Sequence, residues 1–321
     1  MFGKLWAYWR HAFDPSRFRV VMTLLVRNEA DIIEANIRAH AALGVDGFVV
    51  MNHLSNDGTR EILTSLAGEF DLQVIDQLDP AYKQSRWMTE LACFARDRMG
   101  ADWVICNDAD EFWLPCRGES LKELIAFKGV CLTCRRFNML LQRNALQRGY
   151  QFHDSRLRVN NPVFYGNESM VRDEVTVVLS RIAPKVIVNP HGLVKIKGGN
   201  HRALHGMNWL DYNRPYDRIE KFEDIRVFHY PMRGFEHFER NVRRRSLLLS
   251  DDSHVRMGNH YRRWAEMHRL GRLEEEYGRF LLGDEDLRVL KKFGVVTEDD
   301  FPGRTIKKAL GEEAVAERKT A

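Results

Sequence analysis

The sequence predicts an α/β fold in which a mostly parallel β-sheet carries helices on both faces. In the first third of the chain, four short apolar segments alternate with segments of helical periodicity. Polar, turn-forming residues follow the first, second and fourth of these apolar segments. Alternation of this kind indicates βαβ units, and right-handed crossovers between parallel strands place helices on both faces of the sheet.

Each expected element has its own local signal. The strands are short runs rich in β-branched and other apolar residues, expected at 19–26, 47–51, 72–75 and 102–106. The helices between them end at glycines, which commonly terminate helices, and are expected at 30–43, 59–66 and 85–99.

The pattern changes after residue 114, where a β-rich insertion is expected. Its strands are predicted at 131–137, 175–180 and 185–188, with turn signals between them. From Gly234 onward the sequence is helical in pattern and strongly charged. We therefore expect an amphipathic N-terminal helix (1–17), a central domain (18–232, with halves 18–115 and 116–232) and a helical C-terminal extension (233–321).

Composition is that of an ordinary globular protein of 321 residues, with 44% hydrophobic and 29% charged residues. The net charge of +4 permits an anionic partner such as a nucleotide, but it is too small to indicate a dedicated nucleic-acid binder. The five cysteines form an odd set without a regular framework, which favours free thiols and a cytoplasmic location.

Contact with a membrane is expected to be peripheral at most. No segment approaches the roughly 20 apolar residues that a membrane-spanning helix needs. Aromatic and leucine residues between Phe2 and Phe13 recur at helical spacing, with Lys4 and Arg10 nearby. Such a helix could lie on the inner face of a membrane. The simpler interpretation, which we favour, is that it packs against the protein's own body.

Acidic residues stand directly after the fourth predicted strand, as Asp108, Asp110 and Glu111. Ligands of parallel α/β sheets bind beyond the carboxyl ends of the strands, so this segment should meet the polar clusters 27–29 and 52–58 along one edge. An Asp-x-Asp triplet alone is often a solvated turn. At a site of this kind, however, its oxygens would suit Mn²⁺ or Mg²⁺ bridging the phosphates of a nucleotide diphosphate.

Several segments in combination resemble the family-2-like glycosyltransferases of GT-A fold, in the bacterial branch with an Asp-x-Asp-Glu-Phe motif. They are TLLVRNEADII, NHLSNDGTREIL, the Arg86-Trp87 pair and ADWVICNDADEFW. The resemblance covers roughly residues 20–230. It implies a Rossmann-like GT-A sheet, a nucleotide-sugar donor (a UDP-sugar is favoured), a divalent metal ion and inversion at the anomeric carbon.

The resemblance also implies roles for individual residues on the donor side. Glu29 would lie near the base or ribose, and Asp57 would contact the nucleoside. Arg27 and Arg86 would belong to the same donor site. Asp108 matches a ribose- or metal-binding acid.

The metal site implied by the resemblance centres on Asp110, the expected direct ligand. His229, which follows the apolar pair Val227-Phe228, would complete the site, with His201 in the GGNHRA segment as the second choice. An ordinary structural histidine is the alternative for both.

The catalytic base is open between two glutamates. An inverting transfer needs a carboxylate that takes the acceptor's hydroxyl proton. Glu111 adjoins the triplet, and Glu168 lies in the β-rich insertion, where an acceptor could bind; Asp211 and Asp217 are further options.

The expected acceptor is a glycan or a lipid-linked molecule, as in polysaccharide biosynthesis. The residues leave two rival functions: a sugar-phosphate nucleotidyltransferase and a non-catalytic domain that binds nucleotide or glycan. The first would need a glycine-rich, basic loop after the first strand, where this chain has VRNEAD. The intact acidic residues argue against the second.

Overall fold

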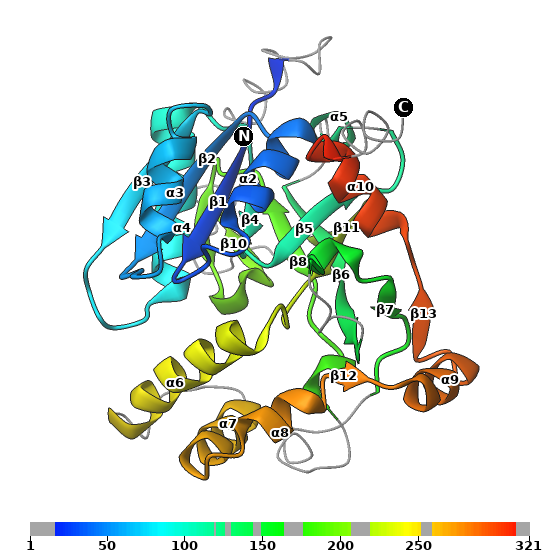
Figure 1. The fold of residues 1–321 in the computed structure, drawn as a ribbon. Helices are drawn as coiled ribbons and strands as arrows, with labels where there is room; N and C mark the ends of the chain where they lie inside the picture. Colours follow the sequence, from blue (N-terminus) through cyan, green and yellow to red (C-terminus); the bar gives the residue numbers. More distant parts are fainter. Residues whose placement is uncertain are drawn as a thin grey trace. The chain divides into compact units, whose positions relative to one another are not determined.

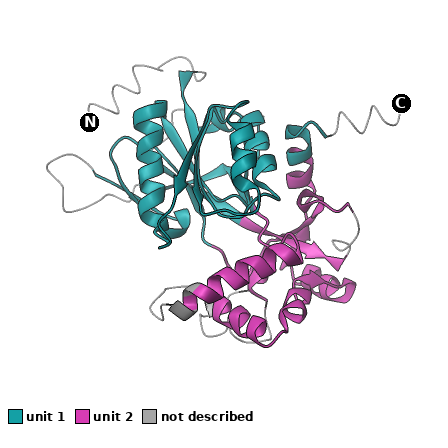
Figure 2. Ribbon diagram, turned by 60° about the vertical axis from the view of Figure 1, so that its left-hand side comes forward, with its two compact units in different colours: residues 1–136, 183–228, 306–321 teal, residues 137–182, 229–305 magenta. Residues whose placement is uncertain are grey.

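The computed structural model describes residues 17–118, 120–125, 130–143, 149–163, 176–206, 219–251 and 259–312. Internal contacts divide the chain into two compact units (Figure 2). The first unit comprises 1–136, 183–228 and 306–321, and the second comprises 137–182 and 229–305. The domain boundaries expected from the sequence stay predictions.

The first unit is built on a parallel sheet (Figure 1). Its four parallel strands lie in the order β3 (Leu72–Gln77), β2 (Gly47–His53), β1 (Val20–Val26) and β4 (Trp103–Asn107). Beyond β4 the sheet continues with antiparallel β8 (Lys185–Val188) and the first residues of β6 (Cys131–Gln142). The predicted mostly parallel α/β sheet is confirmed.

Helices cover both faces of this sheet, as predicted. Helix α4 (Gln84–Met99) packs Trp87, Met88 and Leu91 on the face that carries Val21 and Val49. Strand residues alternate between the two faces, so Met22 points to the other side. On that side lie α2 (Ile33–Ala42) and α3 (Thr59–Leu66).

The remaining elements of the first unit extend the edge near β4. Strand β5 (Glu111–Pro115) pairs with β11 (Ile219–His229), and β9 (Leu193–Ile196) pairs with β10 (Ala203–His205). A short helix, α5 (Leu121–Ile125), and a 3₁₀ turn, η6 (Gly198–Asn200), complete the unit. Strand β5 was not predicted from the sequence.

The second unit combines short strands and helices. Strands β7 (Leu157–Val159) and β12 (Leu281–Leu282) pair with the end of β6, and β13 (Val296–Glu298) pairs with β7. The helices are α6 (Phe235–Asp251), α7 (Asn259–Arg269), α8 (Leu273–Gly278) and α9 (Asp284–Lys292). Helix α10 (Phe301–Ala309) follows β13. The core is aromatic, with Phe238, Trp264, Tyr277 and Phe280 packed together.

Two sequence-based expectations are corrected in this unit. The strand predicted at 175–180 is a 3₁₀ turn, η5 (Val177–Leu179), among the described residues. Its Ser180 hydroxyl donates to the Val177 carbonyl, which favours a turn over an extended strand. The extension predicted as helical also contains β12 and β13, because both pair with strands that are distant in sequence.

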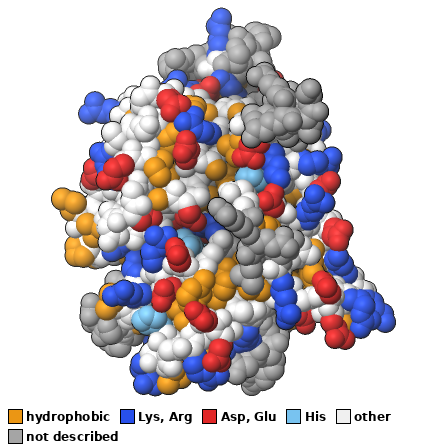
Figure 3. Space-filling model, in the orientation of Figure 1, with side chains coloured by type: hydrophobic (Ala, Val, Ile, Leu, Met, Phe, Trp, Pro, Cys, Tyr) orange, Lys and Arg blue, Asp and Glu red, His pale blue; other side chains and the backbone are white. Residues whose placement is uncertain are grey.

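The described residues agree with the sequence analysis on membrane-spanning helices and on the cysteines. Among the described residues, no helix is both long enough and apolar enough to cross a membrane. All five cysteines are free thiols. Basic and acidic side chains are interspersed over the face shown in Figure 3. The predicted N-terminal helix falls on residues 1–16, which lie outside the described part of the chain.

Candidate functional site

The loops that follow β1 and β2 are joined by hydrogen bonds at the carboxyl edge of the sheet. The Asn28 backbone N–H donates to Ser55 Oγ at 3.0 Å, and Asn28 Oδ1 accepts from the Asn56 N–H at 2.8 Å. The Ala30 N–H donates to Asp57 Oδ2 at 3.2 Å. The polar clusters after these strands therefore meet, as the parallel strand order requires.

Strained backbone marks this edge. Among the described residues, the non-glycine residues with positive φ are Asn28 (60°), Leu54 (54°) and Asn200 (58°). Asn28 and Leu54 lie in the loops after β1 and β2, and Asn200 contacts the acidic segment after β4. The left-handed conformation is unfavourable for leucine in particular. Strain that the surrounding structure maintains tends to cluster at binding sites.

Arg27 places a buried cationic nitrogen at the same edge. It follows the last residue of β1, and burial lowers the pKa of its guanidinium. Among the described residues, its buried Nε has no hydrogen-bond partner. A buried donor without a partner is costly, and an anion bound here would satisfy it.

The other predicted donor residues have distinct surroundings. Both oxygens of Asp57 accept backbone N–H bonds, from Ala30 and, at 3.1 Å, from Thr59 at the start of α3. The Glu29 N–H donates to Thr59 Oγ1 at 2.9 Å, which fixes the backbone that presents the Glu29 side chain. Arg86, in the first turn of α4, is 71% exposed and pairs with Glu90 at 2.7 Å.

Asn36 of α2 holds the backbone of the acidic segment after β4. The Asn36 Nδ2 donates to the carbonyls of Ala109 at 2.8 Å and Glu111 at 2.9 Å. Its Oδ1 accepts from Asn107 Nδ2 at 3.0 Å, and Asn107 Oδ1 accepts from Trp113 Nε1 at 2.9 Å. All these groups are buried. The backbone that carries Asp108 and Asp110 is therefore clamped by a fully buried amide network.

His40 extends this network one turn along α2. Its Nδ1 lies 2.8 Å from the Asn36 carbonyl, and its Nε2 accepts the Trp113 N–H at 3.0 Å. Nδ1 is therefore the protonated nitrogen. Burial lowers the pKa of His40 to about 4, so the ring is neutral at physiological pH. Sequence reasoning missed Asn36 and His40, although both lie on the apolar stripe of the predicted helix, where a polar residue is a signal.

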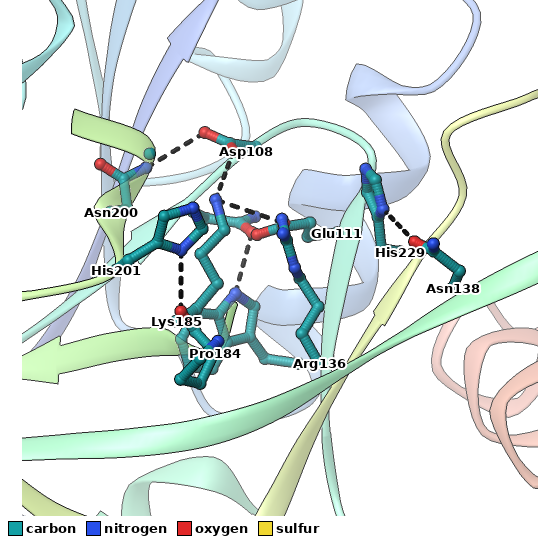
Figure 4. Close-up of polar contacts among 12 residues, drawn as sticks. Asp108, Glu111, Arg136, Asn138, Pro184, Lys185, Asn200, His201 and His229 are labelled. Atoms are coloured by element: carbon teal, nitrogen blue, oxygen red, sulfur yellow. Dashed lines mark hydrogen bonds and ion pairs between the residues drawn. The ribbon is translucent and has the colours of Figure 1, made fainter. Parts of the chain in front are cut away.

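Lys185 brings a buried ammonium to the acidic segment. The antiparallel register of β8 on β4 places this first residue of β8 beside the carboxyl end of β4. Its Nζ forms an ion pair with Asp108 Oδ2 and lies 3.2 Å from Glu111 Oε1 (Figure 4). The side chains of Lys185 and Glu111 are 1% and 0% exposed.

Arg136 of β6 completes a charge-balanced cluster. Its Nη1 donates to Glu111 Oε1 at 2.6 Å. Asp108 and Glu111 are thus matched by Lys185 and Arg136, two carboxylates against two cations. Sequence reasoning missed both cations, because a lone lysine or arginine at a strand position gives no local signal.

Asn200 and the preceding glycine shape the other side of Asp108. Asn200 Nδ2 donates to Asp108 Oδ1 at 3.1 Å, so both oxygens of this carboxylate are engaged. Gly199 has a φ of +76°, and a Cβ there would lie 2.5 Å from the ring of His201. The GGNHRA segment therefore needs glycine at this point for both backbone and space.

His201 lies beside the cluster in the first unit. Its Nδ1 is 2.8 Å from the Pro184 carbonyl, to which it donates. Burial lowers its pKa to about 4, with Lys185 and Arg136 adding to the effect. His201 is therefore neutral, with its lone pair on Nε2.

His229, described within the second unit, has its tautomer fixed. Asn138 Nδ2 donates to the Val178 carbonyl at 2.8 Å, which orients the amide and directs its oxygen to His229. His229 Nδ1 lies 2.7 Å from that oxygen and donates to it (Figure 4). The lone pair is then on Nε2, and a histidine ligand is commonly oriented in this way. The sequence suggested His229 but not its support by Asn138.

The remaining predicted site residues divide into two groups. Asp110 is half-buried and directly follows Ala109, whose carbonyl Asn36 holds. Glu168, Asp211 and Asp217 lie outside the described residues.

Comparison with protein-family models gives no match, and no curated protein matches either. The chain is similar to several solved structures at low identity. A crystal structure of S. aureus TarS 1-349 in complex with UDP-GlcNAc is 15% identical, with a TM-score of 0.42 over 80% of this chain and 71% of that one. The same TarS fragment in complex with UDP is 14% identical, with a TM-score of 0.40 over 92% of each chain.

A third similar structure is glucosyl-3-phosphoglycerate synthase from Mycobacterium tuberculosis in complex with Mn²⁺, UDP-glucose and phosphoglyceric acid. It is 16% identical, with a TM-score of 0.36 over 73% of this chain and 80% of that one. Because all three TM-scores are below 0.5, the function of this chain has to be inferred from its own residues.

Proposed function

We propose that this protein is a glycosyltransferase that moves a sugar from a nucleotide-diphosphate sugar, with a UDP-sugar favoured, to a glycan or lipid-linked acceptor. The observation that supports this most directly is the meeting of two polar loops at the carboxyl edge of the sheet, beside the acidic segment after β4. The loops after β1 and β2 are hydrogen-bonded to each other. Helix α2, which follows the β1 loop, holds the acidic segment. Nucleotides bind at this edge in parallel α/β sheets.

Arg27 and the acidic segment give the edge the chemistry that a nucleotide diphosphate needs. The buried Arg27 Nε offers a hydrogen bond to an anion. The motif resemblance supports Glu29, Asp57, Arg86 and Asp108 as further donor-binding residues. The donor's leaving group is a nucleotide diphosphate, whose growing negative charge must be neutralised as the sugar departs.

A divalent ion, Mn²⁺ or Mg²⁺, fits the proposed site by the chemistry of its side chains. Asp110 offers carboxylate oxygens on a clamped loop. His229 offers an Nε2 lone pair because Asn138 fixes its tautomer. Oxygen and imidazole donors suit Mn²⁺, and Mg²⁺ would rely more on oxygen and water. When bound, the ion would supply positive charge to the diphosphate.

Glu168 is the proposed catalytic base in an inverting transfer. The other candidate, Glu111, is fully buried, and one of its oxygens accepts a hydrogen bond from Arg136. A base must reach the acceptor hydroxyl, which a carboxylate enclosed among Lys185 and Arg136 is badly placed to do. We therefore assign Glu111 a structural role and keep Glu168 for proton transfer.

Nucleotide binding by the purified chain tests this function. Calorimetric titration with UDP should give binding in Mn²⁺ that weakens at least about tenfold in EDTA. A thermal-shift panel of nucleotide sugars, with and without Mn²⁺, should show the largest stabilisation for the true donor with the metal. Equal UDP affinity in EDTA would contradict the metal site. Absence of stabilisation by every nucleotide sugar would contradict the donor assignment.

A further inference from the structure

We infer that Lys185 is a permanent counter-ion of Asp108. This ion pair keeps the Asp108 carboxylate from binding the divalent ion, which Asp110 binds instead. This inference rests on the proposed function, because it concerns which residue of the same acidic segment binds the metal ion. It replaces the metal role that the motif allowed for Asp108. It identifies Lys185, a residue 77 positions away in sequence, as a positioning residue of the site.

Both carboxylate oxygens of Asp108 are engaged by side chains of the first unit. Its Oδ2 is paired with the Lys185 ammonium, and its Oδ1 accepts from Asn200. The Asn200 backbone is held at a positive φ of 58°, a conformation maintained by the surrounding structure. The carboxylate is therefore oriented from two sides by groups that the fold itself places.

The side chain of Lys185 is almost completely buried. A lysine whose side chain is 1% exposed cannot swing into solvent to make room for another cation. Its charge is needed where it is, because Glu111 is fully buried and lies 3.2 Å from the ammonium. Removing either partner of a buried ion pair leaves an uncompensated charge. The ammonium is thus a permanent part of the site.

The charges of the ion-paired cluster around Lys185 are balanced. Asp108 and Glu111 are already matched by Lys185 and Arg136. A divalent ion bound to Asp108 would lie close to the Lys185 ammonium and be repelled by it. The other acid of the triplet, Asp110, then remains as the proposed ligand of the ion, and Asn36 holds the carbonyl of the residue before it. Asp108 then presents a fixed, neutralised carboxylate that can still accept a hydroxyl hydrogen bond.

Binding of Mn²⁺ to the full chain without nucleotide tests this inference, followed by the electron paramagnetic resonance signal of free Mn²⁺. In the wild-type background, Asp108→Asn should change the Mn²⁺ dissociation constant by less than about threefold, whereas Asp110→Asn should raise it at least about tenfold. Lys185→Met should tighten Mn²⁺ binding about tenfold, because it frees Asp108 and removes the repulsion. The gain should vanish in Lys185→Met/Asp108→Asn.

Two control variants separate the effect of the Lys185 charge from an effect on folding. Lys185→Arg keeps the charge and should bind Mn²⁺ as the wild type does. If Lys185→Met fails to fold, Lys185→Met/Glu111→Gln keeps the cluster balanced and replaces it in the test. A loss of about tenfold in Asp108→Asn alone would overturn the inference.

Failure of the proposed function gives a different pattern. If the wild type binds no Mn²⁺, the metal part of the proposed function fails. The assignment of the ion to Asp110 fails with it. The counter-ion role of Lys185 stands if Lys185→Met gains Asp108-dependent binding, and it is overturned if no gain occurs. Turnover of nucleotide sugars, measured separately, reports on the function alone.

Discussion

The side-chain amide of Asn36 donates a hydrogen bond to the backbone carbonyl of Ala109, 2.8 Å away, although 73 residues separate them in sequence. The same Nδ2 also donates to the Glu111 carbonyl. A helix that follows the first strand thereby sets the backbone after the fourth strand. The position of Asp108 and Asp110 thus depends on a residue that contacts neither carboxylate in this network.

Replacing Asn36 should destabilise the protein and loosen the acidic segment. In Asn36→Ala, the two buried carbonyls lose their Nδ2 donor, and Asn107 Nδ2 loses its amide acceptor while keeping its contact with Met22 Sδ. These losses should lower the free energy of unfolding by about 2–4 kcal/mol. Urea denaturation measures this change. Glu34→Gln on the exposed side of α2 is the control, and it should cost less than about 0.5 kcal/mol because Glu34 pairs with Arg38 at the surface. Equal losses in the two variants would contradict the clamp.

His40 should make stability depend on pH below neutrality. The unfolded imidazole takes up a proton below its ordinary pKa of 6.5, whereas the folded one stays neutral down to about 4. The unfolded state therefore binds more protons in this window, and stability is fully present above pH 6.5 and falls as pH drops toward 4. The loss from this residue should be about 3 kcal/mol.

Comparison with His40→Gln isolates that effect. Glutamine can accept from the Trp113 N–H and donate to the Asn36 carbonyl without titrating. His201 and His260, whose pKa values burial also lowers to about 4, are present in both proteins. Urea denaturation at pH 7, 6 and 5 should show a steeper decline for the wild type. Parallel pH profiles would place the dependence elsewhere.

Much of the first unit follows from local sequence signals. Helix α3 (Thr59–Leu66) and strand β8 (Lys185–Val188) have the predicted bounds, because turn residues or glycines delimit short periodic segments. Strand β5 was missed because it begins with the buried acid Glu111. Strand β6 runs five residues past its predicted end at Phe137, to Gln142, because β7 and β12 pair with that extension.

The sequence predicts a site residue only where its position at the end of a strand is enough to locate it in the fold. Asp108 and Asp110 follow a strand end, so topology alone places them at the carboxyl edge. Lys185 and Arg136 reach Asp108 and Glu111 through pairing of β8 with β4 and β6, and such non-local pairing leaves no mark in the sequence near either residue. Charge neutralisation at the site is therefore a tertiary property.

Asp110 should be essential for donor turnover but not for folding. Asp110→Asn removes the charge of the proposed metal ligand and should reduce hydrolysis of the donor sugar by about 100-fold or more. The circular dichroism spectrum and the thermal midpoint should stay near those of the wild type. Asp110 is only half-buried, so the asparagine side chain should fit in its place. Asp71→Asn makes the same change at the amino-terminal end of β3, where Asp71 pairs with Arg19, and should leave turnover unchanged. Undiminished hydrolysis in Asp110→Asn would move the metal site elsewhere.

Glu111 should show the behaviour of a structural residue. Glu111→Gln leaves Arg136 and Lys185 with one carboxylate between them and should lower the free energy of unfolding by about 3–5 kcal/mol. Adding Arg136→Met rebalances the cluster and should recover roughly half of that loss. A Glu111→Gln protein of wild-type stability that lacks turnover would instead identify Glu111 as the catalytic base.

Asn138 should control the affinity of His229 for a metal ion. Asn138→Ala removes the acceptor that fixes His229 Nδ1–H, so both tautomers and several ring orientations become accessible. Loss of such support commonly weakens metal binding by about 10- to 100-fold, and Mn²⁺ titration should show a change of this size. Asn161→Ala, which removes another side-chain amide bond to a backbone carbonyl in the second unit, should leave Mn²⁺ affinity unchanged. If Asn138→Ala folds and binds Mn²⁺ as tightly as the wild type, His229 is a structural histidine and the metal rests on other ligands.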